Sequence, residues 1–487
     1  MKRKNDTGIT LIVLVITIIV LLILAGVTIS AITGDNGTIV NASKAKFRTE
    51  IRDIEEKIEL EEINHNNGED FQFGTLKDLI GREDAYNEIL YMEDGKLVYL
   101  EDKVSDKQAE WLEEMGIKAK QNIIPIYTGE QFKKIGTGEE IQIEEAGGEV
   151  YQFNMDRHYV LQNDIDLNCS EENQWIPIGT SSNPFKGILD GKNYRIKGIY
   201  INGGEYKALF NYNSGTIQNL ILDDGYINAT QFIAGITAVN NVSGKIINCI
   251  NQIEIHASYI VGGIVGRNSG IIENCENRGY LEFNATSGGI CGNNTVSGSI
   301  KKCKNIYEIL LKDFNIGGLV GENYGTIEEC YNLGNILAST SYARYSKGGV
   351  VGRNYGTIKK CYNLAMVTGN SSNWNIGGIA GSNEESGIIE FSYNTGEIIG
   401  KTNVGGIAGH NTGTIRYGYT IDLNEMIGAD AGTLDNCMQL SEKQMKNQEE
   451  IILEDGSTTG FLILLNKEGE YFVEDTKNDN QGYPILK

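Results

Sequence analysis

One short pattern, Gly-Gly-[Ile/Leu/Val]-[Val/Ala]-Gly-x-Asn, recurs through the second half of the chain and constrains its fold more than any other feature. The asparagine that closes each copy, degenerate copies included, stands at Asn213, Asn240, Asn268, Asn294, Asn323, Asn354, Asn383 and Asn411. Successive copies are therefore 27, 28, 26, 29, 31, 29 and 28 residues apart. Glycine and asparagine turns at this frequency leave room only for short strands. Short strands at a nearly fixed period predict a β-solenoid with one coil per repeat.

The column of asparagines invites a ligand-binding interpretation, but a structural one accounts for it better. Asparagine side chains stacked on successive coils can hydrogen-bond each other's amides at the turns. We therefore interpret this column as an internal ladder that holds neighbouring coils together.

A column of cysteines occupies one place in five successive repeats. Its members are Cys249, Cys275, Cys303, Cys330 and Cys361, and each stands three residues after an isoleucine. Thiols stacked in a line about 5 Å apart cannot converge tetrahedrally on zinc, and a disulfide between stacked positions is geometrically awkward. The column predicts buried, reduced thiols, and the sequence offers no metal or cofactor site.

A row of tyrosines directly follows the cysteine column. Tyr331, Tyr362 and Tyr393 stand one residue after this column's place in three consecutive repeats. Adjacent strand positions face opposite ways, so an inward cysteine implies an outward tyrosine. A stacked tyrosine row suits sugar rings or a partner protein. The alternative is that the rings only stabilise the edge of the coil by stacking on each other.

The repeats resemble the GLUG repeat of bacterial surface proteins. This resemblance implies a mainly β fold, a right-handed parallel β-helix or β-solenoid of GLUG-type coils. Around it we expect a small α+β spacer over residues 65–124, a solenoid start or N-terminal cap over 125–205, the repeats themselves over 206–425, and a C-terminal cap over 426–487. Within that cap, the pattern predicts a helix over 441–450 and strands over 461–465 and 471–473.

The N-terminus predicts a single-pass membrane anchor. Lys2, Arg3 and Lys4 precede a stretch without Asp, Glu, Lys or Arg, and residues 9–29 consist almost wholly of Ile, Leu, Val and Thr. A helix of that length spans about one bilayer core. The three cations place the N-terminus in the cytoplasm, so the body of the chain is expected outside the cell.

The run Gly8-Ile9-Thr10-Leu11 after this basic leader resembles the processing site of type IV prepilins. The resemblance implies a leader over residues 1–8, cleavage after Gly8 by a prepilin peptidase, and methylation of Ile9. It also implies a transmembrane helix that continues into an amphipathic helix over 9–64. The fifth residue of a mature pilin is typically glutamate, whereas here it is Val13. This departure leaves two roles open, a minor tip subunit and a prepilin-like anchor that does not polymerise.

Composition and residue types restrict the function. The chain has 42 Lys and Arg against 65 Asp and Glu, a net charge of −23, which argues against a nucleic-acid partner. Its four histidines form no HExxH or HxH motif, and there is no GxSxG or P-loop. We expect no catalytic residues and no enzyme activity. The alternative is a carbohydrate-active β-helix enzyme, a polysaccharide lyase or hydrolase, built around Asp164, Asp166 and Asp190.

The sequence as a whole predicts a membrane-anchored binding rod displayed at the cell surface, with an adhesive or a minor, pilin-like tip role. The partners it implies are the membrane, prepilin peptidase with a pilin-like assembly machinery, and a glycan or surface protein bound by Tyr331, Tyr362 and Tyr393.

Overall fold

The computed structural model describes residues 38–64, 74–93, 95–100, 103–119, 123–283, 286–311, 315–338, 345–369, 375–421 and 425–487. The chain divides into two compact units between Asn122 and Ile123. Gly8, Ile9 and the predicted membrane stretch over 9–29 lie outside the described residues. Among the described residues, no helix combines the length and apolar character needed to cross a membrane.

The first unit combines helices with a small sheet. Its elements are α2 (Thr38–Asn64), β1 (Gly74–Thr75), α3 (Leu76–Ile80), η1 (Ala85–Glu88), β2 (Leu90–Glu93), β3 (Lys96–Tyr99), α4 (Asp106–Glu114) and β4 (Lys118–Ala119). The described N-terminal helix, α2, covers only the last 27 residues of the helical stretch predicted over 9–64. Its apolar stripe of Phe47, Ile51, Ile54 and Ile58 is buried, as helical periodicity predicts, and it shares one core with Leu76 and its neighbours.

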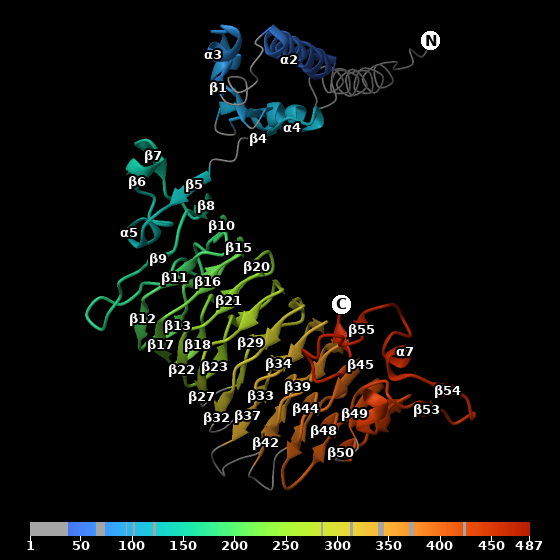
Figure 1. The fold of residues 1–487 in the computed structure, drawn as a ribbon. Coiled ribbons are helices and arrows are strands. Elements are labelled where there is room, and N and C mark those ends of the chain that lie inside the picture. The colour runs from blue at the N-terminus through green and yellow to red at the C-terminus, as the bar shows by residue number, and fades with distance from the viewer. Residues whose placement is uncertain are drawn as a thin grey trace, which may run out of the picture. The chain divides into compact units, whose positions relative to one another are not determined.

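The second unit is a parallel β-solenoid of about nine turns (Figure 1). One coil contains β34 (Val320–Asn323), β35 (Thr326–Glu328), β36 (Tyr331–Asn332), β37 (Ile336–Ala338) and β38 (Ser346–Gly348). Each of these strands pairs in parallel with its counterpart in the next coil. The solenoid therefore consists of stacked coils whose strands form parallel sheets, and the part of the fold predicted from the repeat period is confirmed.

Four parallel sheets form the faces of the solenoid. The first sheet contains β5 (Ile123–Ile126), β8 (His158–Leu161), β9 (Ile165–Asp166), β10 (Ile188–Asp190), β11 (Arg195–Lys197), β15 (Thr216–Gln218), β16 (Ile221–Leu222), β20 (Lys245–Ile247), β21 (Ile250–Asn251), β25 (Ile271–Glu273), β26 (Glu276–Asn277), β30 (Ser299–Lys301), β31 (Lys304–Asn305), β35, β36, β40 (Thr357–Lys359), β41 (Tyr362–Asn363), β45 (Ile388–Asn394), β49 (Thr414–Ile421), β51 (Thr433–Asp435) and β52 (Met438–Leu440). The second sheet contains β12 (Ile199–Asn202), β17 (Gly225–Ala229), β22 (Glu254–Ala257), β27 (Leu281–Phe283), β32 (Ile309–Leu311), β37, β42 (Val367–Thr368) and β46 (Ile398–Ile399).

The other two sheets complete each coil. The third sheet contains β13 (Glu205–Lys207), β18 (Gln231–Ala234), β23 (Ile260–Gly262), β28 (Thr286–Gly288), β33 (Ile316–Gly317), β38, β43 (Asn375–Gly377) and β47 (Val404–Gly405). The fourth sheet contains β14 (Phe210–Asn213), β19 (Thr237–Asn240), β24 (Val265–Asn268), β29 (Cys291–Asn294), β34, β39 (Val351–Asn354), β44 (Ala380–Asn383), β48 (Ala408–Asn411) and β50 (Ile427–Asp430).

The interior of the solenoid is a stack of like residues. The five predicted column cysteines are all buried and free, so their inward assignment is confirmed. Burial raises the pKa of the Cys249, Cys275 and Cys330 thiols, which keeps them neutral in the core. Free cysteine packs here as a small hydrophobic residue beside the isoleucine columns.

Two buried asparagine ladders run through the turns. In the predicted ladder, the amide Nδ2 of Asn323 donates to Oδ1 of Asn354 at 2.9 Å, and the same bond recurs from Asn213 to Asn411. A second ladder, which the sequence analysis missed, joins Asn251, Asn277, Asn305, Asn332, Asn363 and Asn394. Each of its members stands two residues after the cysteine place, and that recurrence is visible in the sequence.

Further segments precede and follow the coils of the solenoid. The N-terminal start adds α5 (Gly129–Phe132), β6 (Glu140–Ile143), η3 (Glu144–Ala146) and β7 (Glu149–Gln152). The C-terminal segment contains α6 (Glu442–Met445), β53 (Ile451–Ile452), β54 (Thr458–Thr459), α7 (Phe461–Leu465), β55 (Phe472–Val473) and β56 (Ile485–Leu486), and it lies against the coils of β45 and β49 (Figure 1). The strand predicted over 461–465 is wrong, because this segment is the helix α7.

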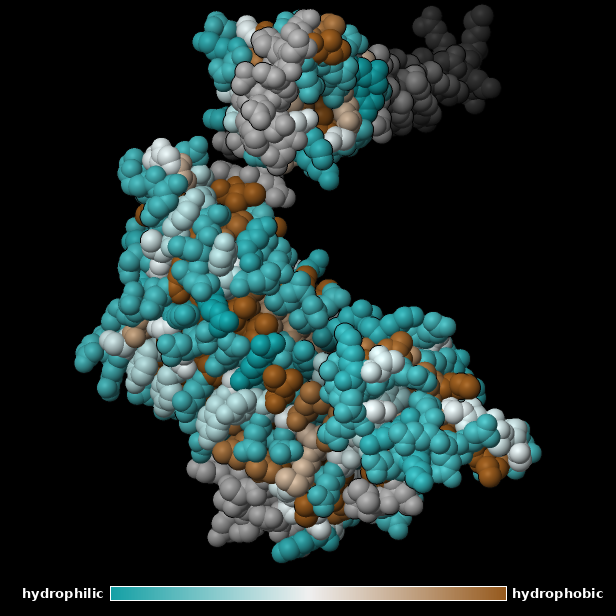
Figure 2. Space-filling model, viewed as in Figure 1, coloured by the Kyte–Doolittle hydropathy of each residue, from teal (hydrophilic) through white to brown (hydrophobic). Residues whose placement is uncertain are grey.

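The surface visible in Figure 2 is mainly hydrophilic, with hydrophobic side chains gathered in small, separate patches. On the face seen in this view, the solenoid therefore has no broad apolar surface.

Candidate ligand-binding groove

A left-handed residue in each coil shapes the outer side of the first sheet. Asn219, Asn248, Asn274, Lys302 and Glu329 have φ angles of 52°, 54°, 53°, 53° and 54°. Each stands directly before the inward cysteine or leucine. In a plain strand, residues three apart face opposite ways, whereas this turn lets both the isoleucine and the cysteine point inward. Asparagine tolerates this conformation better than most residues, which explains its recurrence here.

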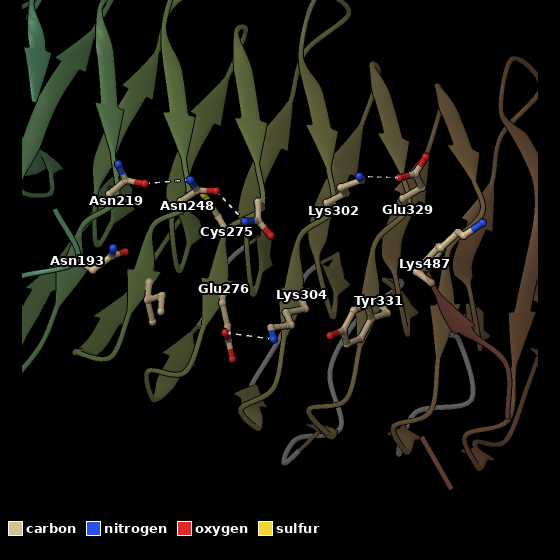
Figure 3. A pocket seen from close by; sticks show the side chains of 13 residues that line it. Asn193, Asn219, Asn248, Cys275, Glu276, Lys302, Lys304, Glu329, Tyr331 and Lys487 are labelled. Carbon is tan, nitrogen blue, oxygen red and sulfur yellow. Dashed lines mark hydrogen bonds and ion pairs between the residues drawn. The ribbon is translucent and has the colours of Figure 1, made fainter. Parts of the chain in front are cut away.

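These turn residues line a groove of about 510 Å³ on the outside of the first sheet (Figure 3). We call it the amide groove; its lining residues include Asn219, Asn248, Asn274, Glu276, Lys302, Lys304, Glu329, Tyr331 and Lys487. Nδ2 of Asn248 donates to Oδ1 of Asn219 at 2.9 Å, and Nδ2 of Asn274 donates to Oδ1 of Asn248 at 2.7 Å. This site was not predicted from the sequence, although the recurrence of asparagine before the cysteine place signals it.

The charged side chains of the amide groove are paired. The Glu276 carboxylate lies 2.7 Å from Nε of Arg278 and 3.3 Å from Nζ of Lys304. Burial opposes its ionisation, but the Arg278 guanidinium and the Lys304 ammonium lower the pKa of Glu276 below its ordinary value. On a neighbouring part of the wall, Nζ of Lys302 lies 3.8 Å from the carboxylate of Glu329. The groove therefore offers many hydrogen-bonding groups with little uncompensated charge.

The predicted tyrosine row faces away from the solenoid core, but most of it is not accessible. Tyr331, Tyr362 and Tyr393 stack with centroid distances of 4.8 and 5.0 Å. The C-terminal segment covers them, and Tyr362 and Tyr393 are only 2% and 0% exposed. The prediction of an open tyrosine platform is therefore wrong for these two residues. Tyr331, at the end of the row, is half-buried and lines the amide groove.

The carboxylates named for the enzyme alternative bond to nearby amides. Asp164 accepts a hydrogen bond from the backbone N–H of Arg195 at 2.9 Å, and Asp166 accepts one from the N–H of Asn168 at 2.8 Å. Burial raises the pKa of Asp190, but hydrogen bonds from Asn219, Lys192 and Gln218 outweigh it and lower the pKa. In the described ranges, no group of three or more His, Cys, Asp or Glu residues could hold a metal ion.

Three comparisons relate this chain to known proteins. The GLUG motif matches residues 313–337, which is one repeat. A protein of Evansella cellulosilytica named "Putative Gly-rich membrane protein" is 32% identical over 122 residues, and the match covers 24% of this chain and 11% of the relative. Among solved structures, a "putative immunoglobulin A1 protease" from Bacteroides ovatus superposes with a TM-score of 0.41 at 16% identity, over 75% of this chain and 92% of that one.

Proposed function

We propose that this chain is a membrane-tethered, adhesive binding rod of the cell surface, and that the amide groove binds an extended, neutral glycan. The observation that carries the proposal is the repetition of like polar side chains on successive coils of the groove. Each coil advances the solenoid by about 4.8 Å. A linear polymer of similar sugar units matches such a row better than a compact small molecule does.

The groups of the amide groove suit hydroxyl-rich ligands. Each asparagine amide has two N–H donors and an oxygen with two acceptor sites, so the bond to its neighbour leaves capacity for a ligand. One face of the Tyr331 ring stacks on Tyr362, and the residue also borders the groove, where its other face can pack against a sugar ring. The acidic surface of the whole chain disfavours polyanionic glycans, so we assign a neutral one.

Removing two amides of the groove should weaken glycan binding. The test uses the full chain in detergent micelles, titrated by calorimetry with neutral glucan, mannan and chitin oligosaccharides. We expect the double variant Asn248→Gly/Asn274→Gly to lose affinity by about thirtyfold, because each of the two lost hydrogen bonds contributes roughly 1 kcal/mol. Glycine adopts the left-handed conformation at no steric cost, so the coil is preserved.

Asn436→Gly is the matched control, because Asn436 is a left-handed asparagine (φ 52°) outside the groove lining. Its affinity should equal that of the wild type. A wild-type chain that binds no oligosaccharide of the panel, or a folded double variant with unchanged affinity, contradicts the proposal. Release of new reducing ends during the titration would point to the polysaccharide-cleaving alternative.

The tether is the second part of the proposed function, and the membrane designation of the Evansella relative is consistent with it. With prepilin peptidase present, we expect the mature chain to begin at Ile9 and the Gly8→Val variant to stay full length. N-terminal sequencing of both proteins from membranes measures this. A wild-type chain that still begins at Met1 rules out processing at Gly8 and leaves a plain anchor, with no place in pilin-like assembly.

A further inference from the structure

A row of aromatic side chains crosses the outside of the second sheet, away from the residues of the amide groove. Tyr200, Tyr226, His256, Tyr280 and Tyr307 follow one another over five coils, with ring centroids 5.5, 5.4, 5.8 and 6.3 Å apart. The first four are half-buried, and Tyr307 is 43% exposed. We call these five residues the aromatic row. Unlike Tyr362 and Tyr393, they are not part of the cluster under the C-terminal segment.

Beyond the stacked pair Tyr200 and Tyr226, the rings of the aromatic row are tilted against their neighbours. Successive rings are inclined by 26°, 41°, 51° and 81°. By contrast, Tyr324 and Tyr355 on another side of the solenoid stack at 4.6 Å with an angle of only 2°. Inclined rings leave part of each π face uncovered, so a flat group can lie on that part, whereas a parallel stack covers the π faces that its two rings turn toward each other.

Carboxylates flank the aromatic row. The Glu254 carboxylate lies 2.5 Å from Nε2 of His256, and the Glu282 carboxylate lies 3.4 Å from Nδ1 of the same ring. The Tyr280 hydroxyl donates to Glu282 at 3.3 Å. Aromatic faces and carboxylates together favour a cation, because ring quadrupoles and negative charges attract the same ligand.

The chain contains an internal example of the same chemistry. The Arg353 guanidinium lies 5.2 Å from the centroid of the Tyr355 ring, and its Nε donates to the Glu384 carboxylate at 2.9 Å. A guanidinium is planar and weakly hydrated, so it stacks on a ring while its N–H groups bond a carboxylate. Lysine has a compact, strongly hydrated ammonium group and matches this arrangement less well.

We propose that the aromatic row, with Glu254 and Glu282, is a docking surface for an arginine-rich segment of a partner protein. The guanidinium groups lie on the uncovered parts of the ring faces and pair with the two carboxylates. The net charge of −23 draws such a segment toward the rod and repels nucleic acids and anionic lipids.

The test compares two labelled peptides, octa-arginine and octa-lysine, binding to the full chain at physiological ionic strength, followed by fluorescence anisotropy. We expect octa-arginine to bind more tightly. The variant Tyr226→Leu/Tyr280→Leu should weaken the binding of octa-arginine by about tenfold. It should weaken the binding of octa-lysine by much less. Leucine retains apolar contact but has no π face. Glu282→Gln should weaken the binding of both peptides.

Two controls separate docking from general attraction to an acidic protein. Tyr324→Leu/Tyr355→Leu removes the same number of rings from the closed stack, and it should leave octa-arginine binding unchanged. Glu171→Gln makes the same charge change as Glu282→Gln at an exposed site, and it should have little effect. If the row variant does not fold, Tyr307→Ala takes its place, because that side chain is 43% exposed.

Equal binding of the two peptides by the wild type, or equal losses in the row and control variants, overturns the proposal in favour of unspecific electrostatics. The Asn248→Gly/Asn274→Gly variant should bind octa-arginine like the wild type. The glycan proposal and the docking proposal can therefore fail separately.

Discussion

Gly349→Ala is expected to destabilise the solenoid by at least about 3 kcal/mol. A Cβ at Gly349 would lie 2.1 Å from the backbone oxygen of Gly378 in the next coil, and 2.2 Å from Cγ of Asn363. Neither neighbour can move away, because one is backbone and the other belongs to a buried ladder. The coils must separate, which weakens both the ladder and the strand pairing. Chemical denaturation followed by circular dichroism measures the loss.

Gly460→Ala is the control for this prediction, since a Cβ there meets only Oδ1 of Asn447 at 3.5 Å. Its unfolding midpoint should stay close to that of the wild type. If Gly349→Ala unfolds at the wild-type denaturant concentration, the close packing assigned to Gly349 is wrong. In a solenoid each coil contacts only its neighbours, so hydrogen exchange should increase first in the coils beside Gly349.

Tyr393→Ala should release the C-terminal segment from the solenoid. The Tyr393 side chain is fully buried, its hydroxyl donates to the backbone oxygen of Pro484, and Nδ2 of Asn480 donates to that hydroxyl at 3.1 Å. Its ring also packs on Phe461 and Phe472. Truncating a buried aromatic residue costs about 3–5 kcal/mol, and much of that loss falls on the docking of this segment.

Hydrogen exchange of α7 and β55 measures the release of the segment. Both elements should lose protection in Tyr393→Ala, while the coils from β14 to β34 keep theirs. Tyr331→Ala is the comparison, because Tyr331 stands at the end of the tyrosine row and is only half-buried. In this variant the C-terminal segment should stay docked. Unchanged protection of α7 in Tyr393→Ala would show that other contacts, such as the one between Lys359 and Glu468 at 2.9 Å, are sufficient to hold it.

Local patterns were sufficient to predict the interior of the solenoid. Ile327 and Cys330 recur in register with their counterparts, and the strand pairing places them on top of one another. The same argument applied to Asn332 would have revealed the second ladder, since that residue recurs as regularly. What local patterns did not show is how Ile327 and Cys330 both point inward, which depends on the left-handed turn at Glu329.

The C-terminal segment shows why the rest was not predictable. Phe461 to Leu465 is an apolar run, and an apolar run of this length fits a strand or a helix equally well. It becomes α7 because Phe461 and Leu465, four residues apart, bury together against the tyrosine row. The surface that selects the helix comes from coils far earlier in the chain, so no pattern within the segment contains that information.

The sequence by itself determined the period, the parallel stacking and the inward columns, because each depends on residues one repeat apart that meet through strand pairing. Only the tertiary structure decided which outward columns stay accessible. Tyr362 and Tyr393 are covered, whereas the amide groove and the aromatic row stay open, since coverage depends on where a distant segment docks. The amide groove therefore lies on a column whose recurrence is visible in the sequence but whose accessibility is not.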